Sequence, residues 1–297
     1  MEDKKDLLET LTGVTNPSQI GLEPKNITEN KSQYYCDALT DENINDVLED
    51  YDSHLVTLVG FSEVGKSTFV SSFYHTLMCT GEIDGYKFLD SDTFVGFERR
   101  AYIRNEALRT SKRNSRTSQI EGHFLTLTLQ KEGKIKKLII SDRAGETYKN
   151  NYTSNIVDVQ KDKGLIYSQH IIFFIDSVSM NNEDLYFDFN DKFQFLLGRM
   201  SAAGVFASNK VYDIIFNKVD LNQTHREKQL FKDQSQNLLN MLKDDFKLNI
   251  SNIFEITSNK MKDKSMHEAF KYIVNTLGVK SLEQCARINW VETFLNE

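Results

Sequence analysis

Short apolar runs alternate with longer amphipathic stretches along most of the chain. The apolar runs predict strands at residues 55–59, 123–129, 135–141, 170–176, 210–216 and 252–257. The stretches between them carry apolar residues three and four positions apart, and they predict helices at about 66–79, 152–169, 183–203, 224–246, 264–277 and 281–295. Strands that alternate with helices are typical of βαβ units, so we expect an α/β fold with helices on both faces of one sheet.

One pair of neighbouring strands departs from this alternation. Only residues 130–134 separate the strand at 123–129 from the strand at 135–141. A connection this short allows a hairpin, whereas parallel strands need a crossover of a dozen or more residues. The sequence therefore predicts a six-stranded, mostly parallel sheet with one antiparallel strand.

Charge divides the chain into unequal parts. Residues 1–54 carry thirteen acidic and four basic side chains. Apolar residues such as Ile44 and Val47 recur there at helical spacing, which fits short helices docked on the main domain and fits a solvated acidic tail equally well. We predict an acidic extension at 1–54, one domain at 55–278 and a C-terminal helix at 279–297.

Composition narrows the function by exclusion. The 297 residues carry a net charge of −7 and 39% hydrophobic residues, a balance that does not indicate a chain whose main role is to coat nucleic acid or an anionic membrane. No window approaches the roughly 18 apolar residues of a membrane span, and the chain has neither a secretion signal nor a lipidation motif at its ends. Three widely spaced cysteines fit a reducing compartment. We expect a cytoplasmic protein with no membrane anchor.

A glycine-containing loop follows the first predicted strand and precedes a predicted helix. Its glycines let successive backbone N–H groups face phosphates, Lys66 reaches the β- and γ-phosphates, and the Ser67 hydroxyl holds Mg²⁺. This strand, loop and helix predict binding of a nucleoside triphosphate. The residues expected to touch the nucleotide here are Gly60, Ser62, Glu63, Val64, Gly65, Lys66, Ser67 and Thr68.

Two later motifs indicate which base the nucleotide carries and which residue serves the metal shell. Asp142 ends an apolar strand, where it can serve the Mg²⁺ shell, and Gly145 follows three residues later, where its N–H can approach the γ-phosphate. The strand at 210–216 runs into Asn217-Lys218-Val219-Asp220. A carboxylate such as that of Asp220 accepts two hydrogen bonds from guanine N1–H and the 2-amino group, and adenine offers no such pair. The predicted ligand is therefore GTP or GDP with Mg²⁺.

Two weaker signals complete the series in the expected order. Ser258, Asn259 and Lys260 follow the last predicted strand, where a loop can close over the base. Thr117 precedes the strand at 123–129, where a switch threonine would coordinate Mg²⁺, and Thr110 is the weaker alternative. The predicted metal ligands are Ser67, Thr117 and Asp142.

These five ordered motifs resemble the Ras-like branch of P-loop GTPases over residues 55–278. The long segment 81–119, which ends near Arg116-Thr117, further resembles the second GTPase of prokaryotic double-GTPase conflict systems. The alternative is that the segment merely embellishes a Rab-like or bacterial Ras-like protein. The resemblance implies a GTP-hydrolysing switch, with a protein effector or regulator and a second GTPase as partners.

The catalytic group is unusual, because Ras-like proteins carry glutamine where this chain has Glu146. We expect Glu146 to position or deprotonate water, with Lys66 and Thr117 stabilising charge. Near the switch, Arg113 and Arg116 are candidates for an arginine of the same chain that reaches the transferred phosphoryl group. Arg143 is a third and weaker candidate. Seven basic residues at 98–116 also fit a solvated surface and, less well, a nucleic-acid patch. The rival function is a GTP-binding scaffold or sensor with little hydrolysis.

Overall fold

The computed structural model describes residues 36–48, 53–104, 122–258 and 263–277. The chain divides into two compact units, Met1–Tyr34 and Tyr35–Glu297, and every described residue belongs to the second. The helix expected at 281–295 and most of the acidic extension lie outside the described residues. The three-part division of the chain therefore stays a prediction.

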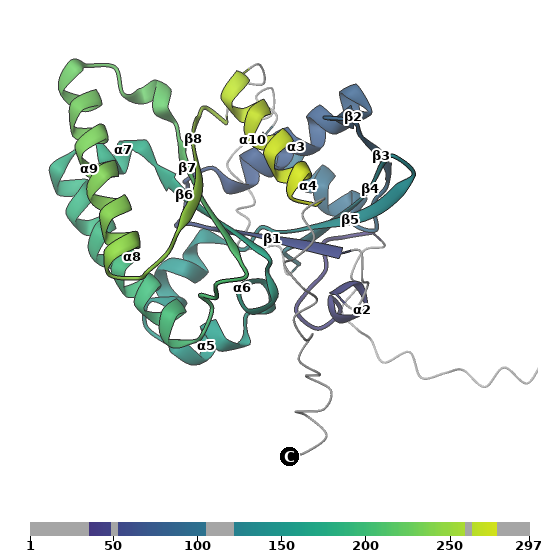
Figure 1. Ribbon diagram of the computed structural model, residues 1–297, viewed down its shortest axis with the longest axis horizontal. Coiled ribbons are helices and arrows are strands. Elements are labelled where there is room, and N and C mark those ends of the chain that lie inside the picture. Colours follow the sequence, from purple (N-terminus) through teal and green to yellow (C-terminus); the bar gives the residue numbers. More distant parts are fainter. Residues whose placement is uncertain (1–35, 49–52, 105–121, 259–262, 278–297) are drawn as a thin grey trace, which may run out of the picture. The chain divides into compact units, whose positions relative to one another are not determined.

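The described residues form one mixed sheet with the strand order β2-β3-β4-β5-β1-β6-β7-β8 (Figure 1). The strands are β1 (Ser53–Val59), β2 (Glu82–Ile83), β3 (Tyr86–Asp90), β4 (Phe124–Lys131), β5 (Lys134–Ser141), β6 (His170–Asp176), β7 (Val211–Asn217) and β8 (Ile250–Ile256). All neighbours from β5 to β8 pair in parallel, and those from β2 to β5 pair antiparallel. The α/β class, the six expected strands and the β4–β5 hairpin are confirmed. The expected count of six was too low by two strands, β2 and β3.

Burial explains why the apolar runs form the centre of this sheet. β6 and β7 are buried almost without interruption, and β1 is buried along its last five residues. Strands covered by helices on both faces read as continuous apolar runs, whereas β8, at the edge, alternates between exposed and less exposed positions. The parallel centre therefore places the ends of β1, β5, β6 and β7 in one buried layer.

Helices cover both faces of the sheet (Figure 1). They are α2 (Asn45–Leu48), α3 (Lys66–Thr80), α4 (Phe94–Arg104), a π-helix (Thr147–Tyr152), α5 (Ile156–Lys161), α6 (Lys163–Tyr167), α7 (Ser177–Met180), α8 (Glu183–Ala202), a 3₁₀ turn (Val219–Leu221), α9 (His225–Asp244) and α10 (Lys264–Thr276). Side chains of α3, α4 and α10 share one hydrophobic cluster with the sheet, and those of α5, α6, α8 and α9 share another. Within the described part of the chain, none of the helices combines the length and apolar character needed to cross a membrane.

The prediction of a single helix at 152–169 is wrong. The chain forms a π-helix, then α5, then α6, because polar caps interrupt it twice. The Asn155 side chain accepts a hydrogen bond from the N–H of Val157 at 3.0 Å, and the Asp162 side chain accepts one from the N–H of Leu165 at 3.0 Å. A cap residue with extended backbone ends one helix and starts the next.

The described part of the long segment after α3 is built into the domain. Asp84 and Gly85 have φ values of 51° and 79°, which suit a two-residue hairpin turn between β2 and β3. This hairpin extends the sheet beyond β4, and α4 then packs on α3. The ring of Phe97 in α4 stacks on Tyr74 of α3 with centroids 4.7 Å apart. The segment is therefore part of the fold rather than a loop laid over it.

Residues 36–48 pack on the antiparallel side of the sheet. The backbone N–H of Leu39 donates to the carbonyl of Phe124 at 2.9 Å, and the N–H of Phe124 donates back to Leu39 at 3.0 Å. Ile44 is fully buried in a small cluster with Leu55, Phe124 and Ile139. This part of the extension docks on the sheet, as one of the two alternatives for it requires.

We predict that Ile44→Ala lowers the free energy of unfolding by about 2–4 kcal/mol, because removing a buried isoleucine side chain leaves a cavity. Equilibrium urea unfolding measures the change. Glu42→Ala, at an exposed position of the same segment, is the matched control and should change stability by no more than about 0.5 kcal/mol. Equal effects of the two substitutions would contradict the docking of this segment.

Candidate functional site

The loop between β1 and α3 has the backbone shape of an anion cradle. Glu63 and Gly65 both take left-handed backbone conformations, with φ values of 64° and 98°. A side chain at Gly65 would also collide with Asn217, since a Cβ there would lie 2.1 Å from Asn217 Nδ2. Turns of this kind point successive N–H groups to one side, at the amino end of α3. The loop is therefore suited to hold a phosphate chain.

Lys66, the first residue of α3, is buried with its ammonium among loop carbonyls. Its Nζ donates to Gly60 O at 2.6 Å and to Phe61 O at 3.3 Å, and it lies 5.5 Å from the centroid of the Tyr148 ring. Burial lowers the pKa of Lys66 to about 8, against the opposing charges of Asp142 and Glu146. The ammonium, Asp142 and Glu146 thus lie within electrostatic reach of one another.

Asp142 follows β5 and has no exposure to solvent. Its Oδ1 accepts the Ser67 hydroxyl at 3.2 Å, and its Oδ2 accepts Nε of Arg100 at 2.8 Å. A hydroxyl and a carboxylate are the oxygen donors that Mg²⁺ prefers when it also binds phosphates. The structure brings Ser67 and Asp142 together, and this pair fits a magnesium site.

Gly145 and Glu146 follow directly, next to the phosphate loop. A Cβ at Gly145 would lie 2.3 Å from both the carbonyl carbon of Phe61 and the nitrogen of Ser62, so only glycine permits this approach. Glu146 precedes the π-helix, whose residue Tyr148 is fully buried. At Gly145, the segment after Asp142 therefore lies directly against the backbone of the cradle.

Arg143 connects this segment to three other parts of the chain. Its guanidinium lies 2.7 Å from carboxylate oxygens of Asp41 and Asp162, and it donates to His123 Nε2 at 2.8 Å. Burial and the neighbouring arginines lower the pKa of His123 to about 2, so the ring is neutral and accepts. Asp41, His123 and Asp162 have the spacing of metal ligands, but Arg143 already supplies the cation between them.

The residues expected to bind the base meet at the end of β7. Asn217 Nδ2 donates to Val64 O at 2.8 Å, and Asn217 Oδ1 accepts the N–H of Ser258 at 2.9 Å. One buried amide thereby joins the phosphate loop, β7 and the segment after β8. Lys218 forms an ion pair with Asp176 at the end of β6, and Asp220 is exposed in the 3₁₀ turn that follows.

Some expected site residues lie outside the described residues, and their roles stay predictions. They are Thr110, Arg113, Arg116, Thr117, Asn259 and Lys260. Ser62, in the phosphate loop, and Thr68, in α3, are partly buried, and Glu63 is exposed.

The sequence shows Arg100 only as one member of the basic run at 98–116, and no short-range pattern distinguishes it from the other basic residues. The buried contact with Asp142 exists only through the packing of α4.

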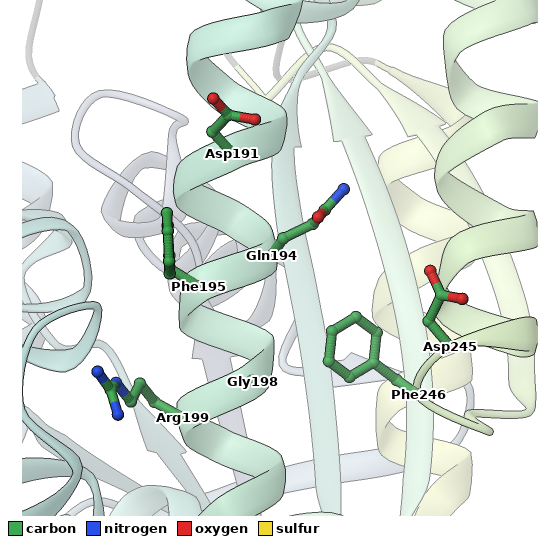
Figure 2. A pocket seen from close by; sticks show the side chains of 7 residues that line it. All are labelled: Asp191, Gln194, Phe195, Gly198, Arg199, Asp245 and Phe246. Carbon is green, nitrogen blue, oxygen red and sulfur yellow. The ribbon is translucent and has the colours of Figure 1, made fainter.

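A separate cleft of about 600 Å³ lies between α8 and the end of α9 (Figure 2). It is lined by Asp191, Gln194, Phe195, Gly198, Arg199, Asp245 and Phe246. None of the nucleotide motifs contributes to its lining. The chemistry described above is therefore concentrated at the ends of β1, β5 and β7, away from this cleft.

We predict that the stability of the wild-type protein rises with pH relative to Lys66→Met. Above pH 8 the folded protein releases a proton from Lys66 that the unfolded chain holds until about pH 10.5, so unfolding becomes less favourable. Since one pKa unit is worth about 1.4 kcal/mol, the gain should reach about 2 kcal/mol by pH 9.5. Urea unfolding at pH 7 to 9.5 measures it. Lys149→Met, at an exposed position, should show no such trend, and neither should the wild type below pH 8.

Comparison with known proteins agrees with this arrangement of motifs. A family model described as Double-GTPase 2 matches residues 54–276. No curated protein matches the chain. Among solved structures, it is similar to nucleolar GTP-binding protein 1 of Plasmodium falciparum, with 16% identity, 82% of this chain and 95% of that chain covered, and a TM-score of 0.41, which is too low to carry weight. Because the family match runs from β1 to the end of α10, over more than half of the chain, the protein belongs to the Double-GTPase 2 family.

Proposed function

We propose that the protein binds GTP with Mg²⁺, hydrolyses it to GDP and phosphate, and acts as a molecular switch. One observation carries the proposal: the hydrogen bond of Asn217 to Val64 joins the guanine motif to the phosphate loop. The two motifs lie far apart in the sequence, and a nucleotide must bridge them. Membership of the Double-GTPase 2 family supports the same ligand.

Guanine selection rests on the residues after β7. The Asp220 carboxylate accepts from N1–H and the 2-amino group, while the stem of Lys218 covers the base and its ammonium stays paired with Asp176. Asn217 accepts the N–H of Ser258 and so holds the start of the segment that is proposed to close over the base. The exposure of Asp220 leaves its carboxylate accessible to the base.

Hydrolysis is proposed as an in-line attack of water on the γ-phosphorus. The bond from that phosphorus to the bridging oxygen breaks, GDP leaves, and the proton of the water passes to Glu146 or to the released phosphate. Lys66 and the loop N–H groups stabilise the charge on the phosphate oxygens, and Lys66 also offsets the charge of Glu146. Ser67, Thr117 and Asp142 would hold Mg²⁺, which would supply further positive charge at those oxygens.

The switch itself is proposed to reside in the segments around Thr117 and Gly145. The close approach of Gly145 to Phe61 and Ser62 supports this, because it keeps the segment next to the loop that would hold the phosphates. We place the protein in the cytoplasm, with a second GTPase as its partner in a prokaryotic defence or conflict system. The family description supports the pairing, and a second GTPase gene next to this one would be its simplest test.

We predict that Asp220→Asn weakens GTP binding by at least about 100-fold. The amide N–H of asparagine would face a donor of guanine, and the remaining bond would lose its charge; a hydrogen bond to a charged group is worth about 1.5–3 kcal/mol. The same variant should gain affinity for xanthosine triphosphate, whose 2-carbonyl accepts from the new amide. Titration with fluorescent nucleotide analogues measures both affinities. Asp244→Asn makes the same charge change at an exposed position at the end of α9, and this variant should bind GTP normally. Unchanged GTP affinity in Asp220→Asn would overturn the assignment of the base site.

We predict that Glu146→Ala slows single-turnover GTP hydrolysis by about 10²–10⁴-fold while GTP affinity stays within a few-fold of the wild type. Rapid-quench measurement of phosphate release gives the rate. Glu255→Ala, an exposed glutamate on β8, is the control. An unchanged rate would remove Glu146 from the mechanism. Tight GTP binding without multiple turnover by the wild type, with or without a partner, would instead favour the scaffold function.

A further inference from the structure

Arg100 is an arginine with no exposure to solvent, and it is the largest fully buried side chain among the described residues. All three guanidinium nitrogens donate hydrogen bonds. Nε donates to Asp142 Oδ2 at 2.8 Å, one terminal nitrogen donates to Gly96 O at 3.0 Å, and the other donates to Gly122 O at 3.3 Å. The fork is thus fixed on three sides, and its charge is directed at one carboxylate.

This contact determines how Asp142 is oriented. With Oδ2 held by Arg100, Oδ1 is the oxygen that receives the Ser67 hydroxyl at 3.2 Å. A carboxylate rotates about its last bond unless both oxygens are held, and its terminal torsion has broad energy wells. Arg100 therefore selects the orientation in which Asp142 serves Ser67 and the metal shell.

The helix that carries Arg100, α4, is itself packed tightly on its neighbours. Phe97, one turn earlier on α4, is fully buried and stacks on Tyr74, and the Tyr74 hydroxyl donates to Glu98 at 2.9 Å. Gly96 approaches the segment 36–48 so closely that a Cβ would lie 2.7 Å from the nitrogen of Ala38. α4 is therefore packed between α3 and that segment, which leaves Arg100 little freedom.

Stability alone does not explain a charge pair at this place. Burying two charges costs several kcal/mol of hydration, and apolar residues of similar volume often serve a fold equally well or better. The carboxylate in this pair, that of Asp142, is also the one that accepts the hydroxyl of Ser67. Arginine also offers a planar fork that lysine lacks, and here all of that fork is used.

We propose that Arg100 is a positioning residue for the magnesium site: it holds Asp142 toward Ser67 and makes α4 a working part of nucleotide binding. This inference rests on the proposed function, because it assigns a role within the same site. It differs from an arginine that touches the phosphates. Arg100 acts through Asp142, from the buried side of the carboxylate.

The test compares Arg100→Gln with Arg99→Gln. The neighbouring Arg99 also pairs with an aspartate, but this is Asp37 at 2.7 Å, and the Arg99 side chain is 37% exposed. For each protein, binding of a fluorescent GTP analogue is measured against Mg²⁺ concentration, and binding of the GDP analogue is measured in EDTA. Thermal unfolding of each variant confirms that the protein is folded.

We expect Arg100→Gln to raise the half-saturating Mg²⁺ concentration about tenfold, with metal-free GDP affinity within about twofold of the wild type. Arg99→Gln should leave both unchanged. The sign is decisive, because removing a cation that merely repels Mg²⁺ would lower the half-saturating concentration. A lowered or unchanged value in folded Arg100→Gln overturns the inference.

Two further variants keep the test valid if Arg100→Gln does not fold. Arg100→Lys retains the charge but cannot hold Asp142, Gly96 and Gly122 together, so its Mg²⁺ requirement should rise severalfold, and a wild-type value overturns the inference. Asp142→Asn should raise the Mg²⁺ requirement, and adding Arg100→Gln to it should raise that requirement no further, whereas additive effects contradict action through Asp142.

A wild-type protein without Mg²⁺-dependent GTP binding would overturn the proposed function itself. A normal wild type with unaffected Arg100 variants overturns this inference alone.

Discussion

One buried carboxylate, that of Asp142, constrains the arrangement of the site. It follows β5 at a point where the strand is covered on both faces, and a charge without access to water is tolerated only when neighbouring groups compensate it. Ser67 supplies a hydroxyl from α3, Arg100 supplies a cation from α4, and Lys66 adds a second positive charge. The need to satisfy this single group therefore fixes two helices against the end of β5.

The base side of the site is held together differently. There a neutral amide, Asn217, connects the phosphate loop and the segment after β8 through hydrogen bonds that need no counter-charge. Neutral hydrogen bonds respond less to a change of charge nearby than the ion pairs around Asp142 and Arg143 do. The contacts of Asn217 are therefore less sensitive to the charge of the bound phosphates than the contacts of Asp142 are.

The sequence predicted the parts of the fold that depend on local pattern. The buried runs of β1, β6 and β7 were visible because central parallel strands are apolar on both faces. β1 leads into the phosphate loop, and β6 and β7 end at Asp176 and Asn217. The dipeptide Asp84-Gly85 is a turn signal but was not used to predict a hairpin, because β2 has two residues and β3 is largely exposed, so that neither has the pattern of a strand. The capping side chains of Asn155 and Asp162 were equally visible, yet helical periodicity masked them.

The Asp142–Arg100 pair could not have been predicted in this way, since it joins residues 42 positions apart through the packing of α4 on α3. Its consequence concerns the status of the whole insertion. A surface embellishment can be lost with little effect on the domain beneath it, but removal of α4 would leave the Asp142 carboxylate buried without its cation. Breaking a buried pair by removing one partner costs about 3–5 kcal/mol, a large share of the stability of a domain. The described part of the insertion is therefore tied to the phosphate loop by the same electrostatic requirement that places Ser67, and the two are expected to change together in any variant of this fold that keeps Asp142.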